Sequence, residues 1–174
     1  MKKIVFLSLF IITVYNTEAQ KRNELVISAE AATPDFKNNL GGGFFIKGLH
    51  KIGKASQVTL SMGFAHFQPG NTLLDLTPVL AGYKQNFGNF FVEPQAGLGQ
   101  LSGQIPIDGD FVRPFVVAFF GAINAGYTIK KFSLGLRFQT AHGIQSERAG
   151  IWHDKNFQYE SIFVGYRILP GKKK

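Results

Sequence analysis

The sequence predicts an all-β protein, an eight-stranded antiparallel up-and-down transmembrane barrel that follows an N-terminal signal peptide. Three observations predict this fold. Apolar residues alternate with small or polar ones along most of the chain, and no helical period appears after the N-terminal segment. Tight turns alternate with longer polar connections. The polar side of the alternation holds few charges, which come in both signs.

Residues 1–19 have the order of a secretory signal peptide. Lys2 and Lys3 give a basic start, an apolar run follows, and Ala19 provides the small residue near its end. The apolar run is about 11 residues long, whereas a membrane-spanning helix needs about 20. We therefore expect export, a barrel domain over residues 20–170 and a basic tail over residues 171–174.

The alternation predicts eight strands in the exported part. They lie near residues 24–31, 40–50, 56–67, 74–86, 89–101, 113–128, 132–142 and 157–168. The second of them, "LGGGFFIKGLH", is the least regular. The third, "SQVTLSMGFAHF", is the most regular, since every second residue from Val58 to Phe64 is apolar and Gln57, Thr59 and Ser61 fall between.

The fourth and fifth strands form a hairpin around "NFGN". Val79, Ala81 and Tyr83 share one face before the turn, and Phe90, Val92, Pro94, Ala96 and Leu98 share one face after it. Lys84, Glu93 and Gln95 lie on the opposite face. The last three strands repeat this pattern, with Phe115, Leu134 and Ile162 on apolar faces and Asn124, Arg137 and Ser161 opposite.

The connections differ in length from one end of the predicted barrel to the other. Three are tight: "KIGK" at 51–54, "NFGN" at 86–89 and "IKK" at 129–131. The others, near 31–40, 68–73, 102–112 and 143–156, are mostly longer and more polar. Outer-membrane barrels have short periplasmic turns and long extracellular loops, so we expect these four loops to face outward.

Alternation alone leaves open which face points inward. In a soluble barrel the apolar face would enclose an apolar ligand, as in a periplasmic lipocalin-like carrier. We favour the membrane orientation because a water-facing surface would be more highly charged. Aromatic residues also fall near the strand ends, where the membrane interface would lie: Phe67, Phe87, Phe90, Phe111, Tyr127, Phe132, Phe157 and Tyr159.

With the apolar face outward, the charged strand residues point into the lumen. They are Glu30, Lys47, Lys84, Glu93, Arg137 and Arg167. We expect them to form a charge network, separated by small Gly, Ser, Thr, Gln and Asn side chains that fill a narrow polar lumen.

Composition excludes several function classes. The chain has no cysteine, which removes disulfides and thiolate metal sites. The net charge is +8, but the basic residues are scattered along an exported chain, so we expect no nucleic-acid partner. No cofactor motif is found, because "GGG" at 41–43 precedes no helix. His142, His153 and Asp154 are metal-ligand types, but such a set is common by chance and predicts no metal site.

The segments "TPVLAGYKQNFGNFFVEPQAGLG", "LGLRFQ" and "IFVGYRI" resemble outer-membrane β-barrel domain proteins of Gram-negative bacteria. The resemblance implies a place in the outer membrane, a full lumen and a structural or interaction role in the envelope. It also implies three kinds of partner: outer-membrane lipid or lipopolysaccharide, the barrel-assembly machinery, and an extracellular partner reached through the loops. The departure is "YRILPGKKK", which continues past the aromatic residue that usually ends such barrels.

A weaker likeness is carried by "TAHGIQSERAGIWHDKNFQYES". It is similar to the lipid A deacylase family, whose barrels hold a His, a Ser and a Glu on the outer surface. The resemblance implies an esterase in which Ser146 attacks an acyl ester, His142 takes its proton and Glu160 orients the imidazole. The family's motif places Ser two residues after His and Asn next, whereas four positions separate His142 from Ser146 here.

Overall fold

The chain folds into a closed antiparallel β-barrel. The computed structural model describes residues 23–34, 40–68, 73–107, 110–112, 115–145 and 156–169. Its strands are β1 (Asn23–Pro34), β2 (Gly41–Lys51), β3 (Ser56–Phe67), β4 (Leu73–Phe87), β5 (Phe90–Ile107), β6 (Asp110–Val112), β7 (Phe115–Ile129), β8 (Phe132–Gln145) and β9 (Asn156–Leu169). Within these ranges, no helix has the length and apolarity needed to cross a membrane.

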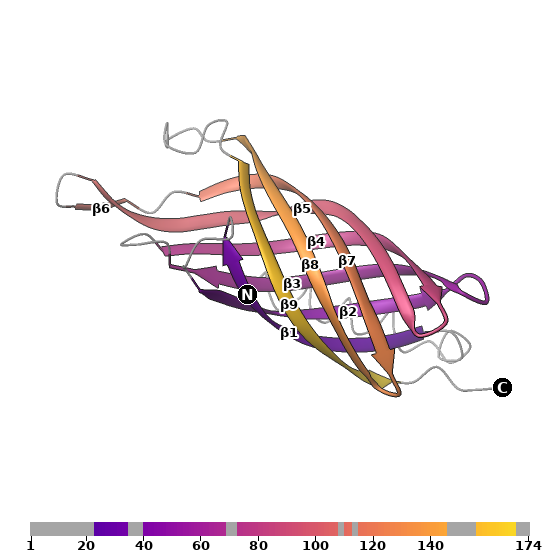
Figure 1. The fold of residues 1–174 in the computed structure, drawn as a ribbon. Helices are drawn as coiled ribbons and strands as arrows, with labels where there is room; N and C mark the ends of the chain where they lie inside the picture. The colour runs from indigo at the N-terminus through magenta and orange to yellow at the C-terminus, as the bar shows by residue number, and fades with distance from the viewer. Residues whose placement is uncertain are drawn as a thin grey trace.

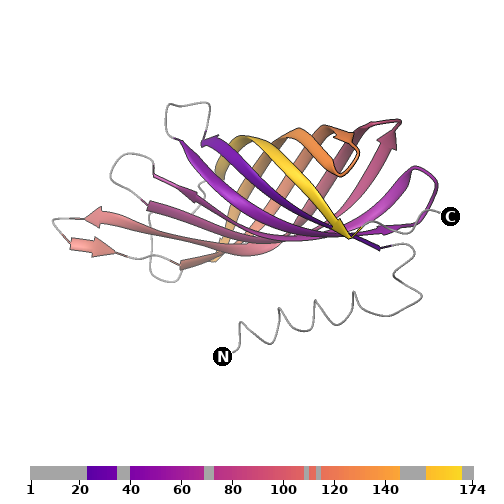
Figure 2. The same ribbon diagram turned by 90° about the horizontal axis from the view of Figure 1, so that it is seen from below.

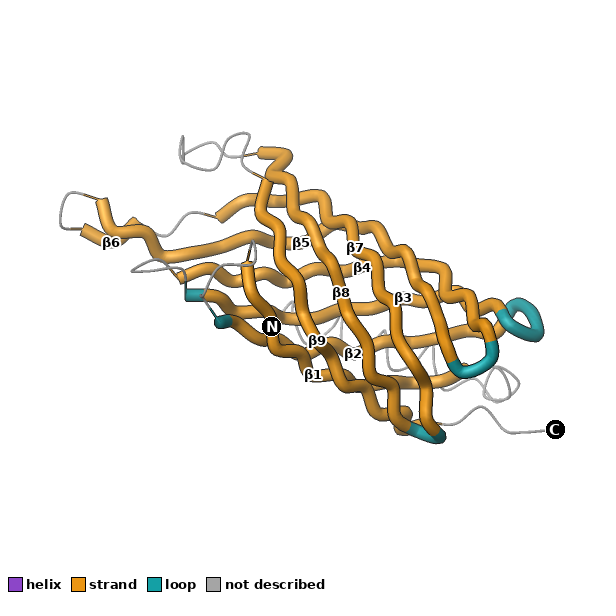
Figure 3. The backbone as a smooth tube through the Cα atoms, in the orientation of Figure 1, coloured by secondary structure: helices purple, strands orange, loops and turns teal. Residues whose placement is uncertain are grey.

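Eight of the strands form the barrel wall, and each pairs with its neighbour in the chain (Figure 1). The ring closes where β1 pairs antiparallel with β9, so that Ala31 lies opposite Ile162. The short β6 pairs only with the end of β5 and lies outside the ring. Figure 2 shows the tilted strands enclosing a single interior, and Figure 3 shows the wall as an almost continuous layer of strand. The predicted up-and-down barrel is confirmed.

The three tight turns lie at one end of the barrel, as predicted. β4 and β5 are joined by Gly88 and Asn89, and Gly88 has a φ of 65° that glycine adopts without steric cost. β7 and β8 are joined by Lys130 and Lys131, and Lys130 has a φ of 55°. We call this end the short-turn end. The opposite end, where the longer connections begin, is the loop end.

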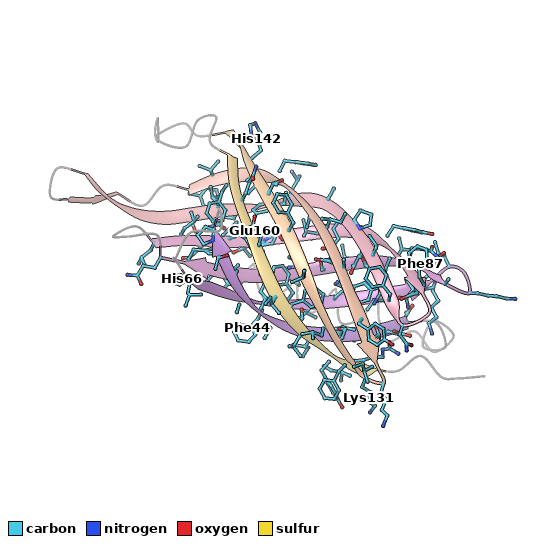
Figure 4. All side chains as sticks on the ribbon, in the orientation of Figure 1. Phe44, His66, Phe87, Lys131, His142 and Glu160 are labelled. Carbon is cyan, nitrogen blue, oxygen red and sulfur yellow. The ribbon has the colours of Figure 1, made fainter. Side chains whose placement is uncertain are left out.

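The apolar face of the wall points outward. Outward side chains such as Phe44, Leu98 and Leu136 are 68%, 53% and 62% exposed, whereas Glu93 is fully buried inside. Figure 4 shows Phe44 on the outside of the wall. A soluble carrier would have the reverse arrangement, with its apolar side chains enclosed. A wall of exposed Phe, Leu, Ile and Val is stable where hydrocarbon surrounds it, which confirms the predicted membrane orientation.

The prediction for the aromatic residues is partly wrong. Phe87, Phe90, Tyr127 and Phe132 are exposed near the short-turn end, as expected for a membrane interface. Phe67 and Tyr159, however, are fully buried inside the barrel, and Phe157 is half-buried against them. The reason is strand parity: these three residues share the inward face with Ala65 and Ser161, so their position near the loop end does not bring them to lipid. The side chain of Phe111 lies outside the described residues.

The loop predicted over 102–112 is also partly wrong. β5 continues to Ile107, and Asp110–Val112 returns as β6 with Phe111 opposite Pro106. The hairpin extends beyond the barrel wall at the loop end (Figure 1). Its two strands pair with each other along one edge, which satisfies part of their backbone past the ring.

Glycine makes room for large rings inside the barrel. A Cβ on Gly63 would collide with the ring of Phe45, which lies opposite it across the β2–β3 pair. A Cβ on Gly135 would come within 2.7 Å of Cζ of Phe163. At these two positions, glycine allows close packing in the lumen.

Candidate functional sites in the lumen and on the outer wall

One ion pair at mid-height links opposite regions of the wall. The Nζ of Lys47 lies 2.6 Å from Oε2 of Glu93, and the two residues are 8% and 0% exposed. The amide of Gln95 donates to Oε1 of the same carboxylate at 2.8 Å. Because a buried charge is costly unless paired and hydrogen-bonded, this arrangement satisfies both partners.

A second buried ion pair joins β8 to β1. Nη1 of Arg137 lies 3.2 Å from Oε2 of Glu30. The hydroxyls of Tyr159 and Ser161 donate to the same carboxylate at 3.1 Å each. The Nε of Arg137 donates to Oδ1 of Asn124 at 2.8 Å, and its guanidinium lies 3.9 Å from the ring centroid of Phe45. Charge, hydrogen bonds and stacking together fix one arrangement of this cluster.

A third group lies nearer the short-turn end, around Glu24. Its carboxylate is 3% exposed and contacts Nζ of Lys51 at 2.9 Å and Nε of Arg167 at 3.1 Å. Lys84 also points into the lumen, and its Nζ lies 3.8 Å from the centroid of the Phe91 ring. We call these charged residues the ionic half of the lumen: Glu24, Glu30, Lys47, Lys51, Lys84, Glu93, Arg137 and Arg167.

The structure places all six of the predicted lumen charges in this half. It brings Lys47 to Glu93 and Arg137 to Glu30, and it brings Arg167 to Glu24, which the sequence analysis did not single out. Strand parity could have predicted the inward position of Glu24. Glu24 and Glu30 lie an even number of residues apart on one strand, so their side chains point to the same face.

The rest of the lumen is apolar. Toward the loop end, buried side chains pack into one cluster, which we call the apolar plug. Its members are Ala32, Ala65, Phe67, Leu74, Leu76, Leu80, Leu101, Val116, Ala118, Phe120, Ala122, Ala141 and Tyr159, with Phe157 packed against them. The rings of Phe67 and Tyr159 have centroids 4.9 Å apart. The expectation that small polar side chains fill the whole lumen is wrong for this half.

Tyr159 joins the two halves. Its ring belongs to the apolar plug, while its hydroxyl reaches Glu30 in the ionic half. The lumen is thus filled from the ion pairs near the short-turn end to the packed rings near the loop end, and it has the character of a protein core.

The outer wall carries a hollow near the loop end. Its volume is about 610 Å³, and its described lining is mostly apolar. The lining comes from β1, β7, β8 and β9 and from the segment before β2: Ala31, Ala32, Thr33, Leu40, Ile123, Ala125, Leu136, Arg137, Phe138, Glu160, Ser161 and Ile162. Small residues such as Ala31 and Ala125 make the hollow, because bulkier neighbours stand around them.

The residues of the predicted triad lie at different heights on this wall. Glu160 lies opposite Phe138 in the β8–β9 pair, whereas His142 lies opposite Asn156. The four positions between Phe138 and His142 correspond to about 13 Å along a strand. Figure 4 shows His142 at the strand ends and Glu160 well below it. The structure therefore does not bring these two side chains together, and Ser146 lies outside the described residues, as do His153 and Asp154.

Comparison with solved structures identifies the class of fold. The chain is similar to the N-terminal β-barrel domain of OprF from Pseudomonas aeruginosa, with a TM-score of 0.63 and 14% identity over 84% of this chain and 98% of that one. It is also similar to Ail, the attachment invasion locus protein of Yersinia pestis, with a TM-score of 0.57 and 12% identity over 84% and 98%. The outer-membrane enzyme PagL matches with a TM-score of 0.54 and 12% identity over 81% and 98%.

These likenesses establish the fold, that of the small eight-stranded outer-membrane β-barrels. The apolar outer wall agrees with a place in that membrane. No protein-family model matches the chain, and no curated protein matches its sequence.

Proposed function

We propose that this chain is a non-conducting outer-membrane barrel with a structural or interaction role in the cell envelope. One observation carries the proposal, namely the filled lumen. Ion pairs with side chains at most 10% exposed, such as Lys47–Glu93, occupy one half, and packed Phe and Leu side chains occupy the other. A barrel of this size has an interior just wide enough for side chains to fill, and the described side chains fill it, which supports a barrel that conducts no solute.

Because the described side chains fill the lumen, the loop end is the surface that we propose for recognition. The β5–β6 hairpin extends past the wall there, and the connections over 35–39, 69–72 and 146–155 start from the same end. Binding residues are often found on loops held by a rigid scaffold, and this barrel is such a scaffold. The expected partner is an extracellular one, since the short turns face the opposite side.

Single-channel recording tests the proposal. We expect the refolded chain to give no conductance steps in planar bilayers, under conditions in which an open porin gives regular steps. Heat-modifiable migration in gels is the control for folding, because a folded barrel migrates differently from the denatured chain. Regular steps from the folded protein would contradict the sealed lumen.

A second candidate function is a lipid A esterase that uses His142, Ser146 and Glu160. The observation that favours it is the apolar hollow in the outer wall, whose lining includes Glu160 and opens toward the acyl chains of the membrane. The likeness to PagL supports the fold of an enzyme-bearing barrel and goes no further. The register counts against the esterase, because His142 and Glu160 would have to meet for the imidazole to be oriented.

Mass spectrometry of lipid A separates the two candidates. Cells that express the wild type and cells that express Ser146→Ala should give identical acylation patterns if the protein is structural. Loss of one acyl chain in the wild type alone would favour the esterase.

A further inference from the structure

Basic residues that are scattered along the sequence gather at one end of the barrel in space. The turn between β2 and β3 carries Lys51 and Lys54, and the turn between β7 and β8 is made of Lys130 and Lys131. All four are exposed. Arg167, near the end of β9, has a side chain that is 27% exposed at the same end. We call these five residues the basic collar.

The sequence continues this charge on both sides of the barrel. Lys21 and Arg22 directly precede β1, which begins at the short-turn end, and Lys172, Lys173 and Lys174 follow β9, which ends there. Within the part of the chain that the structure describes, the carboxylates nearest this end are Glu24 and Glu93, and both are buried. Lys51 and Arg167 contact Glu24, and Lys47 pairs with Glu93. None of these carboxylates lies exposed beside the collar lysines. The end therefore has a large excess of positive charge.

The loop end has no such excess. On the outer wall there, His66 pairs with Asp75 at 2.6 Å, and Glu160 adds a further carboxylate. The connecting segments contain Asp35, Asp108, Glu147 and Asp154 as well as basic residues. The asymmetry along the barrel axis argues that the collar faces an anionic surface.

Exposed aromatic side chains indicate where the basic collar lies relative to the lipid headgroups. Tyr83, Phe87, Phe90, Tyr127, Phe132 and Tyr166 are 41% to 61% exposed around the same end. Aromatic rings of this kind settle at the level of lipid headgroups. The Nζ of Lys131 lies 6.0 Å from the ring centroid of Tyr166, and the Tyr166 ring packs on Phe132 at 5.1 Å. The collar lysines thus lie next to these aromatic side chains, within reach of headgroup phosphates.

We propose that the basic collar binds the anionic headgroups of phospholipids, phosphatidylglycerol in particular, in the leaflet around the short turns. Lysine stems lie along the apolar wall while their ammonium groups reach the phosphates, an arrangement that long cationic side chains adopt at interfaces. Anionic lipids would then be enriched around one end of the barrel. The inference is independent of whether the lumen conducts.

Spin-labelled lipids test this binding directly. The full exported chain is reconstituted in phosphatidylcholine vesicles that contain a trace of spin-labelled phosphatidylglycerol or of spin-labelled phosphatidylcholine. Electron paramagnetic resonance then gives the fraction of each label held at the protein surface. For the wild type at low salt, we expect the phosphatidylglycerol label to associate about fivefold more strongly than the phosphatidylcholine label.

The collar variant combines Lys54→Gln, Lys130→Asn and Lys131→Gln. Asparagine is chosen at 130 because it tolerates the positive φ of that residue, and Lys51 is kept because it contacts the buried Glu24. A matched control removes the same charge from the loop-end connections by Lys37→Gln, Arg148→Gln and Lys155→Gln. We expect the preference to fall to near onefold in the collar variant and to persist in the control.

Salt provides a readout that needs no variant. At about 1 M salt the Debye length is about 3 Å, so the preference of the wild type for the phosphatidylglycerol label should also be lost. Equal association of the two labels with the wild type, or a loss as large in the loop-end control, would overturn the proposal. So would a finding that the collar mediates sedimentation with purified peptidoglycan sacculi while the lipid preference is absent, because the anionic partner would then be the cell wall.

Discussion

The two halves of the lumen solve the same packing problem with opposite chemistry. The ionic half fills the barrel with charged side chains that pair inside it, such as Lys47 with Glu93 and Arg137 with Glu30. The apolar plug fills it with residues such as Phe120 and Leu76, both fully buried. In the first half, each charged group depends on a few specific partners. In the second half, each group depends only on shape and volume.

The difference teaches that strand parity and lumen chemistry are separate properties. Leu80 and Lys84 lie on the same face of β4, yet one belongs to the plug and the other to the ionic half. Parity decides whether a side chain points into the lumen or toward lipid. Its position along the strand decides whether its neighbours in the lumen are apolar or charged. Volume-conserving substitutions should therefore be tolerated in one half and harmful in the other.

The largest expected effect comes from Arg137→Met in the ionic half. Methionine keeps most of the volume but leaves Glu30 buried without its cation, which should lower the free energy of unfolding by about 3–5 kcal/mol. Urea unfolding of the protein in lipid vesicles measures it. The control is the double variant Arg137→Met/Glu30→Gln, which removes both charges and should recover a large part of the loss. A double variant as unstable as the single one would contradict the pairing argument.

A comparable but purely steric effect is expected in the apolar plug. Leu76→Ala removes buried methyl groups and leaves a cavity, which should lower the free energy of unfolding by about 2–5 kcal/mol in the same assay. The matched variant Leu76→Met conserves volume and should cost less than about 1.5 kcal/mol. If Leu76→Met were as harmful as Arg137→Met, the contrast between the two halves would fail.

Much of this architecture could be predicted from the sequence, because strand parity is a local property. The eight wall strands, the three tight turns and the inward position of Lys84 and Glu93 all follow from period two and turn residues. The apolar plug could not be predicted in that way. Phe67 and Leu74 look like lipid-facing residues by composition; parity turns them inward, and the pairing register is needed to show that they are cross-strand neighbours within one cluster.

The close contact of Gly63 with Phe45 gives a smaller effect, at the junction between the halves. Gly63→Ala places a methyl group against the ring and should lower the free energy of unfolding by about 1–3 kcal/mol. The double variant Gly63→Ala/Phe45→Leu should lose less than the sum of the two single variants, because the smaller side chain makes room. Simple additivity in the same urea assay would argue against a direct clash.

The smallest effect is expected for the exposed ion pair on the outer wall near the loop end. His66 and Asp75 approach to 2.6 Å, as closely as Lys47 and Glu93 do, but their side chains are 47% and 38% exposed. His66→Gln should therefore change the free energy of unfolding by no more than about 1 kcal/mol. A loss as large as that of Arg137→Met would mean that burial is not what separates the two kinds of pair.

The candidate sites were less accessible to sequence reasoning than the fold. Charges could be assigned to the lumen by parity, but their partners depend on which strands come close when the ring closes, as for Arg137 on β8 and Glu30 on β1, which both flank β9. The outer-wall hollow depends on small residues from several strands, among them Ala31 and Ala125, that become neighbours only when the ring closes. His142 and Glu160 share a face, yet the register separates them, which spacing along the chain does not reveal.

The pairing of β1 with β9 has a consequence for how the protein is made. Leu25 pairs with Leu169, so β1 has no neighbour on that side until β9, the last strand of the wall, has been made. Until then, two unsatisfied strand edges are available to any other extended chain. A nascent or prematurely terminated product would thus be prone to aggregate, and delivery to the bilayer must shield both edges until synthesis is complete.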